Sequence, residues 1–443
     1  MQHPHQDPNG VAFSMRGAAL LQINRDHAPH YDHLIESGLY RELAASNLIV
    51  RYKESGLKYA RNDDAYRVLK RQPLPGLRTY PHEWPFSAWK AAAMGLLAIA
   101  ETALAHDMTL KRVSPWAVTL TPDGPLFTDL LAFELSDEGR RWGAYRQFVD
   151  VWLSPLALMA TVDPHAGGLL RAYPNGLPRA MVSAMLPVRT RMGLGGLNTH
   201  IHASGRDITA ARGKDALRET LLGLRETVEG LRWSPPDDAS RNYDPTDYDT
   251  ATEDYRRELV RRALSDTMSE TVWDIHAGDG AFTHVARTLA GHTVAFAPSP
   301  VAAERLYQQF TGEAPNVQVA VIDWANPSPG LGWGYRDARG LLGRGSPDML
   351  IALGWLQRVV LADGVPLPEV AALLAKLAPR LVIEFVPITD PHAIAQMRDE
   401  PPPPEHYSQD AFEAAFGAHY NILAADDVVH TERVIYHLER HTD

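Results

Sequence analysis

The chain of 443 residues contains no cysteine. Disulfides, thiolate metal sites and cysteine nucleophiles are therefore excluded, and we expect the protein to reside in a reducing, cytoplasmic environment. The sequence also lacks a continuous run of about 18 apolar residues, so no segment is expected to span a membrane. The first ten residues are rich in His, Pro and Asn and have no apolar core of the kind that marks a signal peptide.

The chain has fewer basic than acidic residues. Lys and Arg number 43 against 54 Asp and Glu, which gives a net charge of −11. An acidic protein is poorly suited to sequence-independent binding of nucleic acid, because it repels the phosphate backbone. We therefore expect a small-molecule or peptide substrate, together with a protein partner or a homo-oligomer, and neither nucleic acid nor membrane as a partner.

The first half of the chain has the pattern of an α+β domain, predicted over residues 11–232. Hydrophobic spacing and turn residues predict strands over 11–23 (a hairpin around Gly17), 48–52, 66–69, 77–80, 118–120 and 126–133. Helices are predicted over 31–43, from a cap at Ser87 to residue 105, and over 142–159, 167–186 and 215–231.

Two polar features interrupt this half. Asp129 lies within the apolar 126–133 strand, where an acid needs either a hydrogen-bonded partner or a metal. His200 and His202 form an H-x-H pair, but two ligands do not make a metal site, so no metal is expected.

A change of composition separates the two halves. Residues 233–250 are polar and contain Pro, Asp and Tyr, which predicts a linker or a lid. A second domain is predicted over 251–443, opening with a helix over 251–264. The four arginines of this helix are interpreted as a solvated face rather than a phosphate grip.

The second domain is organised around residues 271–280. An apolar strand ends in Asp274, Gly278 and Gly280 follow, and a helical pattern runs to residue 289. Strand, glycine-rich turn and helix open a Rossmann-like unit, because glycines let the backbone approach a nucleotide and the helix N-terminus offers unpaired N–H groups. A plain strand–helix connection is the alternative.

The pattern after this turn alternates. Strands are predicted over 293–297, 317–323, 349–353 and 381–386, helices over 301–310, 366–377 and 412–416, a Gly/Trp-rich insert over 324–347, and a closing strand pair over 420–425 and 434–438. Strand–helix steps followed by a strand pair are typical of a seven-stranded α/β sheet of the class I methyltransferase kind, whose last strand is antiparallel.

Several longer motifs occur in one order along residues 31–438. They are 80–84 (YPHEW), 144–148 (AYRQF) leading into 155–159 (PLALM), 326–329 (NPSP) with 331–333 (LGW), 365–368 (VPLP) and 383–387 (IEFVP). In these motifs the chain resembles a bacterial family of two-part class I S-adenosylmethionine-dependent methyltransferases with nodulation-type relatives. The resemblance implies a Rossmann-like C-terminal domain behind a reduced protein-kinase or aminoglycoside-phosphotransferase fold.

The kinase-like resemblance implies a degenerate N-terminal half. A kinase needs an Asp as base, and an Asn and a second Asp for magnesium. The family positions of the first two are occupied by Arg112 and Ala117, and only Asp129 remains. Phosphoryl transfer is therefore not expected, and this half is interpreted as a scaffold or substrate-binding domain. A residual nucleotide pocket at Asp129 is the weaker alternative.

The methyltransferase resemblance implies that S-adenosylmethionine is the cofactor. The cofactor-binding residues that it implies are Asp274, His276, Ala277, Gly278, Gly280, Ala297, Asp323 and Trp324. In this class, Asp274 orders the turn at the methionine end, Asp323 accepts a hydrogen bond from the adenine amino group, and Trp324 lies beside the adenine ring.

Four positions depart from the family pattern. His276 stands in place of the first glycine, and Ala297 in place of the acid that binds both ribose hydroxyls, where Ser299 would have to substitute. Gln357-Arg358 replaces His-His. Losing a charge-assisted ribose contact costs on the order of 1.5–3 kcal/mol, which weakens binding without abolishing it.

Two functions follow. One is methyl transfer from S-adenosylmethionine to a small-molecule or peptide acceptor. The other is a catalytically silent pseudoenzyme that acts as a binding or regulatory subunit of another enzyme. No catalytic base can be assigned, and His276 and Tyr335 are candidates only because they are near the expected site in sequence.

Overall fold

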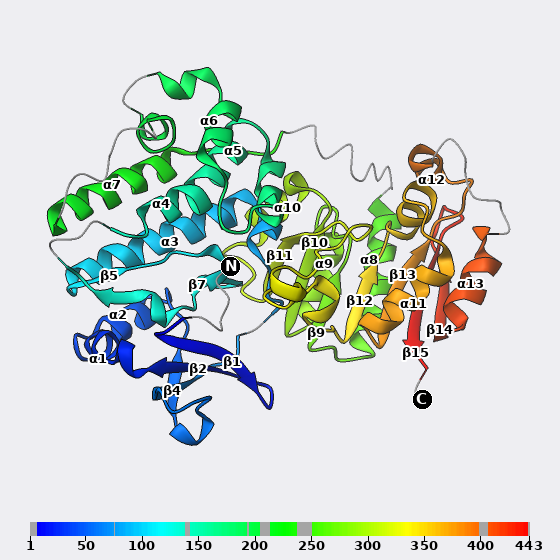
Figure 1. The fold of residues 1–443 in the computed structure, drawn as a ribbon. Coiled ribbons are helices and arrows are strands. Elements are labelled where there is room, and N and C mark those ends of the chain that lie inside the picture. The colour runs from blue at the N-terminus through cyan, green and yellow to red at the C-terminus, as the bar shows by residue number, and fades with distance from the viewer. Residues whose placement is uncertain are drawn as a thin grey trace. The chain divides into compact units, whose positions relative to one another are not determined.

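A computed structural model describes residues 7–74, 76–137, 142–192, 195–203, 213–236, 250–397 and 406–441 (Figure 1). The chain divides into two compact units. Unit 1 consists of Met1–Ser234 and Leu331–Ala338, and unit 2 of Pro235–Gly330 and Arg339–Asp443. Most of the predicted linker or lid lies outside the described residues, which resume at 250.

Unit 1 contains a four-stranded antiparallel sheet in the order β1-β2-β4-β3 and two small two-stranded antiparallel sheets, β5 with β8 and β6 with β7. Its strands are β1 Gly10–Met15, β2 Ala18–Asn24, β3 Tyr52–Ser55, β4 Ala65–Arg71, β5 Met108–Leu110, β6 Val118–Thr121, β7 Gly124–Phe127 and β8 Phe133–Leu135. Its helices are α1 Ala28–Glu36, α2 Leu39–Ala45, α3 Phe86–Ala105, α4 Tyr145–Phe148, α5 Ser154–Thr161, α6 Arg179–Met185 and α7 Lys214–Gly230.

Several predicted boundaries in unit 1 are wrong. The 31–43 helix is two helices, because Gly38 adopts a φ of 83° between them. Helix α3 begins at Phe86 with Pro85 as its cap, so Ser87 lies inside the first turn. Residues 77–80 form no strand.

Two longer predicted elements are also interrupted. The 126–133 strand stops at Phe127, and Asp129 precedes a short 3-10 turn. The 167–186 helix is a 3-10 segment, Pro164–Arg171, followed by the separate helix α6, which begins after Pro178.

Helix α3 is the core helix of unit 1. Among the described residues it is the one helix long and apolar enough to cross a membrane, although 56% of its most apolar window is buried inside the protein. Trp89 of α3 packs edge to face against Trp84 and Trp152, with ring centroids 5.3 and 5.2 Å away. Burial of this kind accounts for the apolar composition without a membrane.

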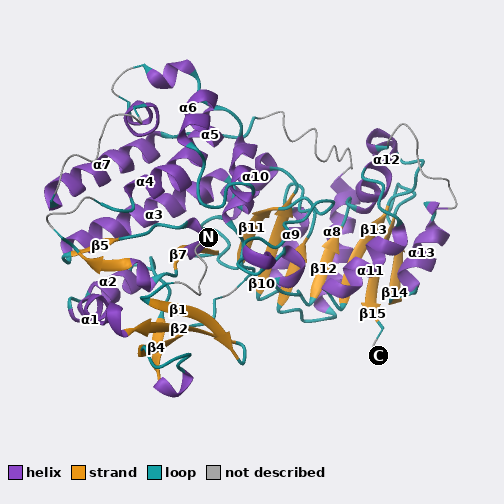
Figure 2. Cartoon of the chain, in the orientation of Figure 1, coloured by secondary structure: helices purple, strands orange, loops and turns teal. Residues whose placement is uncertain are grey.

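Unit 2 is built on a seven-stranded sheet in the order β11-β10-β9-β12-β13-β15-β14 (Figure 2). The β9–β13 strands are parallel, and β15 is antiparallel to both of its neighbours, which confirms the predicted antiparallel last strand. The strands are β9 Thr271–Asp274, β10 His292–Ala297, β11 Val317–Val321, β12 Met349–Ala352, β13 Arg380–Phe385, β14 Tyr420–Asp427 and β15 Val434–Arg440. The helices are α8 Thr250–Ser265, α9 Ala281–Leu289, α10 Pro300–Phe310, α11 Leu367–Leu377, α12 Pro391–Gln396 and α13 Gln409–Gly417.

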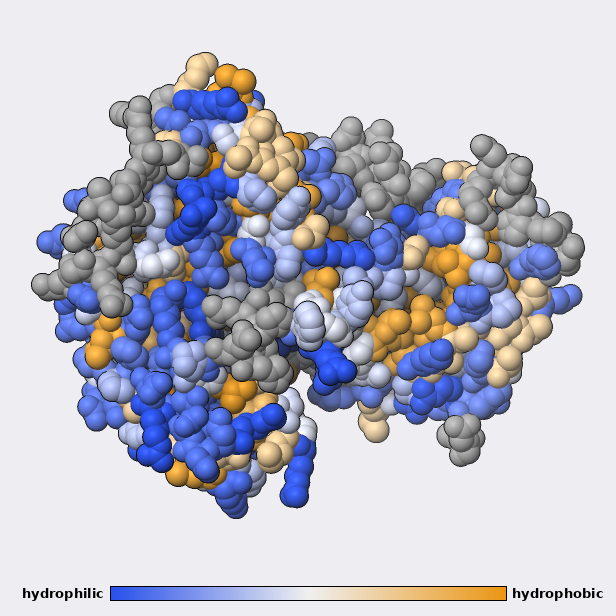
Figure 3. All heavy atoms as spheres, in the orientation of Figure 1, coloured by the Kyte–Doolittle hydropathy of each residue, from blue (hydrophilic) through white to orange (hydrophobic). Residues whose placement is uncertain are grey.

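Apolar residues cover both faces of this sheet. On one face, α8 and α9 pack on Val272, Ile351 and Val382, and α10 packs beside them on β10 and β11. On the other face, the ring of Phe412 of α13 packs against Phe385 and Tyr436 in tilted arrangements. Polar residues cover most of the molecular surface in the view of Figure 3. Open α/β sheets with both faces covered in this way hold ligands at the carboxyl ends of their parallel strands.

Candidate functional site

The glycine-rich turn lies where the carboxyl end of β9 meets the start of α9. Gly278 and Gly280 have φ values of 54° and 89°, which favour glycine. The turn is fixed to the sheet because the N–H of Ala277 donates to the carbonyl of Phe296 at 3.0 Å. A Cβ at Gly280 would lie 3.1 Å from Leu306, so this glycine also permits close packing of the turn on α10.

Asp274 is the last residue of β9 and lies directly before this turn in the chain. Its side chain is buried, and Oδ2 accepts a hydrogen bond of 2.7 Å from the Thr283 hydroxyl on α9. Burial raises the pKa of Asp274 to about 7, against the opposing effect of the Thr283 hydrogen bond. Its second oxygen, Oδ1, is buried and has no hydrogen-bond partner in the described part of the chain.

His276 occupies the position of the missing glycine without a positive φ. The backbone therefore tolerates a side chain here. Burial lowers the pKa of His276 to about 4, and the positive charge of Arg358 acts in the same direction, so the ring is neutral at pH 7. Its Nδ1 is buried and unpartnered among the described residues, and a Cβ built on Gly354 would lie 4.0 Å from it.

Ala297 ends β10 beside the turn. It is fully buried and belongs to an apolar cluster with Ala303 and Leu306 of α10. Ser299 caps α10, and its hydroxyl accepts the N–H of Ala302 at 3.2 Å. The hydroxyl that would replace the missing acid therefore already accepts one hydrogen bond, which leaves one lone pair and its proton for the ribose hydroxyls.

Asp323 and Trp324 follow β11 at the same edge of the sheet. Asp323 is exposed, and its Oδ1 accepts the N–H of Ala325 at 3.0 Å. Trp324 is buried edge to face against Phe296, at 5.4 Å between ring centroids and 84°. Its indole Nε1 is buried with no hydrogen-bond partner in the described chain.

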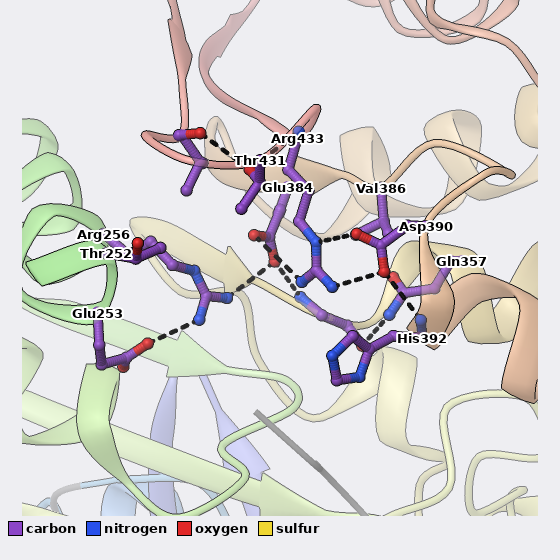
Figure 4. A network of polar contacts seen from close by, with 12 residues as sticks. Thr252, Glu253, Arg256, Gln357, Glu384, Val386, Asp390, His392, Thr431 and Arg433 are labelled. Carbon is purple, nitrogen blue, oxygen red and sulfur yellow. Dashed lines mark hydrogen bonds and ion pairs between the residues drawn. The ribbon is translucent and has the colours of Figure 1, made fainter. Parts of the chain in front are cut away.

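The loop after β12 completes this edge, and sequence reasoning missed what holds it. The N–H of Gly354 donates to Oε2 of Glu384 at 2.9 Å, and its carbonyl accepts Nε2 of Gln357 at 2.9 Å. Oε2 of Glu384 also accepts Nη2 of Arg256 on α8 at 2.9 Å (Figure 4). Arg256 is buried, so the interpretation of its helix's arginines as a solvated face is wrong at this position. An acid inside the apolar RLVIEF strand was the available signal.

The remaining candidates lie in unit 1. Arg112 donates from Nε and Nη2 to Asp129 at 2.5 and 2.9 Å and also pairs with Asp7, so Asp129 has the partner that its position requires. Tyr335 belongs to the Leu331–Ala338 segment and is 78% exposed.

The two histidines of unit 1 are also hydrogen bonded. Nδ1 of His200 bonds the Tyr145 hydroxyl at 2.8 Å, and His202 bonds Ser183 and Thr190. Within the described residues, no group of three or more His, Asp or Glu could hold a metal ion.

No protein-family model matches the chain. The nodulation protein NoeA of Rhizobium meliloti (strain 1021) is 26% identical over 455 aligned positions, which cover 98% of this chain and 95% of the relative. The N-methyltransferase NodS of Bradyrhizobium japonicum WM9, in complex with S-adenosyl-L-homocysteine, is 11% identical, with a TM-score of 0.35, over 46% of this chain and 98% of NodS. The magnesium protoporphyrin IX methyltransferase ChlM of Synechocystis PCC 6803 is 16% identical, with a TM-score of 0.32, over 46% of this chain and 94% of ChlM. The relative thus aligns with almost the whole chain, whereas these solved structures cover less than half of it.

Proposed function

We propose that unit 2 binds S-adenosylmethionine at the carboxyl ends of its parallel strands and transfers a methyl group to a small-molecule or peptide acceptor. One observation carries the proposal. Buried polar atoms without partners in the described chain gather at this edge: Oδ1 of Asp274, Nδ1 of His276, Trp324 Nε1 and Oε1 of Gln357. Such atoms are costly unless a ligand satisfies them.

The position of these atoms supports the same proposal. The chain runs from β9 outward to β10 and β11, then returns to β12 on the other side of β9. This reversal is the switch point at which open α/β sheets bind nucleotides. The similarity to a nodulation protein along almost the whole chain agrees with the nodulation-type resemblance of the sequence.

The residues present fit the proposed cofactor. The turn with Gly278 and Gly280 would receive the methionine end, with the neutral His276 ring beside it, and the exposed Asp323 carboxylate would accept from the adenine amino group. Bound S-adenosylmethionine would supply an electrophilic methyl group. The chain's own contribution is to orient the acceptor and exclude water, which are the main demands of an in-line displacement.

A second candidate is the silent subunit. The buried His276 ring and the apolar surroundings of Ala297 favour it, because both occupy places where a methyltransferase of this class holds its cofactor. In this case unit 2 would serve a partner enzyme or a second copy of the chain, without transferring a methyl group.

For unit 1 we propose a scaffold or substrate-binding role. Its kinase-like resemblance leaves Asp129 as the one candidate magnesium ligand, and the Arg112 guanidinium already neutralises that carboxylate. We place the whole protein in the cytoplasm, since it has no cysteine.

Calorimetric titration with S-adenosylmethionine tests the proposal. We expect one site per chain, and we expect Asp323→Ala to weaken binding about tenfold, as the loss of one charge-assisted hydrogen bond would do. Glu313→Ala, which removes an exposed acid beyond the far end of α10, is the matched control and should bind as the wild type does. If millimolar ligand produces neither heat nor a shift in melting temperature, the proposal is contradicted, and the silent subunit remains as the candidate function.

A further inference from the structure

We infer that Glu384 is a positioning residue, whose buried carboxylate fixes the loop after β12 and thereby sets the affinity for the amino-acid end of the cofactor. The inference rests on the proposed function. Glu384 is the fifth residue of β13, is 0% exposed, and points toward the α8 face of the sheet. Within the described residues its hydrogen bonds go to Arg256 and Gly354 and not to the glycine-rich turn, so its influence on the site passes through the loop.

Glu384 is held from two sides by arginine. Oε2 accepts Nη2 of Arg256 at 2.9 Å, and Oε1 lies 3.8 Å from Nη1 of Arg433. Each arginine is in turn anchored by another acid. Arg256 donates to Glu253 at 2.8 Å, and Arg433 binds Asp390 with two hydrogen bonds of 2.7 and 2.8 Å (Figure 4). The carboxylate therefore has little freedom to rotate away from Gly354.

The backbone of Gly354 connects the Glu384 carboxylate to the proposed site. Its N–H is fixed by Glu384 and its carbonyl by the Gln357 side chain, each at 2.9 Å. Its φ of 64° favours glycine, and the imidazole of His276 lies beside it, since a Cβ built on Gly354 would lie 4.0 Å from Nδ1. The position of Gly354 therefore affects two unpartnered atoms of the proposed site. One is Oε1 of Gln357, whose amide is bonded to the Gly354 carbonyl, and the other is Nδ1 of His276, which lies beside this glycine.

Stability alone does not explain a carboxylate here. Burying an ion pair removes both charges from water, and a well-packed apolar set of similar volume is often at least as stable. An apolar side chain could not accept the Gly354 N–H, however. The acceptor is the feature of Glu384 that packing cannot replace, and it is aimed at the loop beside the cofactor edge.

Two ligands separate this role from general stability. S-adenosylhomocysteine carries the amino-acid end, and 5′-methylthioadenosine lacks it. We expect Glu384→Gln to weaken S-adenosylhomocysteine about tenfold while changing 5′-methylthioadenosine less than about twofold, as expected for one misplaced hydrogen-bonding group. Asp390→Asn is the matched control. It disturbs the same network at Arg433, does not touch Gly354, and should leave the affinity ratio of the two ligands unchanged.

Hydrogen exchange tests the same role without a ligand. Amides of residues 353–358 should exchange faster in Glu384→Gln than in Asp390→Asn. Only the first variant replaces the charged acceptor of the Gly354 N–H by a weaker, neutral amide oxygen, and it also turns an NH2 group toward an arginine. Glu384→Asp keeps the charge but withdraws the carboxylate by one methylene, and provides a second variant if Glu384→Gln does not fold.

The outcomes are separable. If the wild type binds neither ligand, the proposed function fails, and faster exchange over 353–358 would still support the link from Glu384 to the loop. If the Glu384 variants leave both the affinity ratio and the exchange as in Asp390→Asn, Glu384 is a purely structural residue and the inference is overturned.

Discussion

Asp274 couples the folding of unit 2 to pH. Its unfolded pKa is near 4, whereas burial raises its folded pKa to about 7, so the folded state holds the proton more tightly. This contribution favours the folded state at low pH and is lost as the pH rises through 7. Asp274→Asn keeps an acceptor for Thr283 and removes the titration. Urea unfolding should show that the free energy of unfolding of the wild type falls by about 2–3 kcal/mol, relative to that of this variant, between pH 5 and pH 8. Parallel pH profiles would contradict the shifted pKa.

Ala297 tests the ribose contact. Ala297→Asp buries a carboxylate in an apolar cluster, so it should lower the melting temperature of the ligand-free protein. If ribose hydroxyls donate to that carboxylate, affinity for S-adenosylmethionine should rise about ten- to a hundredfold, since a charge-assisted bond contributes roughly 1.5–3 kcal/mol. Ala297→Asn should help less. Unchanged or weaker binding in the titration would mean that the ribose is held elsewhere or that the site does not serve this cofactor.

The sequence predicted single residues unevenly. That Asp274 ends β9 and that the turn glycines follow it could be predicted, because apolar spacing and glycine act locally. The network around Glu384 could not, because Arg256, Gly354, Glu384 and Arg433 come from four separate segments that only the sheet topology brings together. The substitution at His276 was visible, but its neutral charge depends on burial beside Arg358.

At the scale of elements, the junction of β9 with α9 depends on Gly280. Alanine there would combine a φ of 89° with a Cβ 3.1 Å from Leu306 and Phe310, which should destabilise the protein by about 1–3 kcal/mol. Gly417→Ala, at the end of α13, meets nothing within 4 Å and should be neutral or slightly stabilising. Chemical unfolding of the two variants makes the comparison. Equal stability would show that the turn relaxes to admit a side chain.

Element types were predicted better than element ends. The strands and helices of unit 2 follow strong hydrophobic periodicity, and each predicted strand from 271 to 438 is present. Unit 1 was predicted less well where the cause was not periodic. Gly38 divides one predicted helix, and Pro178 precedes the second part of another. Apolar residues on both sides of Asp129 led to the wrong prediction of a strand where the chain forms a turn.

At the scale of the whole molecule, ligands should act on one unit only. S-adenosylmethionine at about a hundred times its Kd should stabilise unit 2 by about 2.7 kcal/mol. ATP with magnesium should leave the melting temperature unchanged, because the Arg112 guanidinium already binds both oxygens of Asp129. Differential scanning calorimetry with each ligand makes the test. A rise in melting temperature with magnesium and ATP would contradict this prediction and would indicate a nucleotide site in unit 1.

The discontinuity of unit 1 has a consequence during synthesis. Leu331–Ala338 belongs to unit 1, although residues 235–330 of unit 2 precede it in the chain. A ribosome must therefore translate β9, β10 and β11 before it delivers the last piece of unit 1. The first 234 residues would therefore emerge before this segment, and a gene cut between Ser234 and Pro235 would separate the segment from the rest of unit 1.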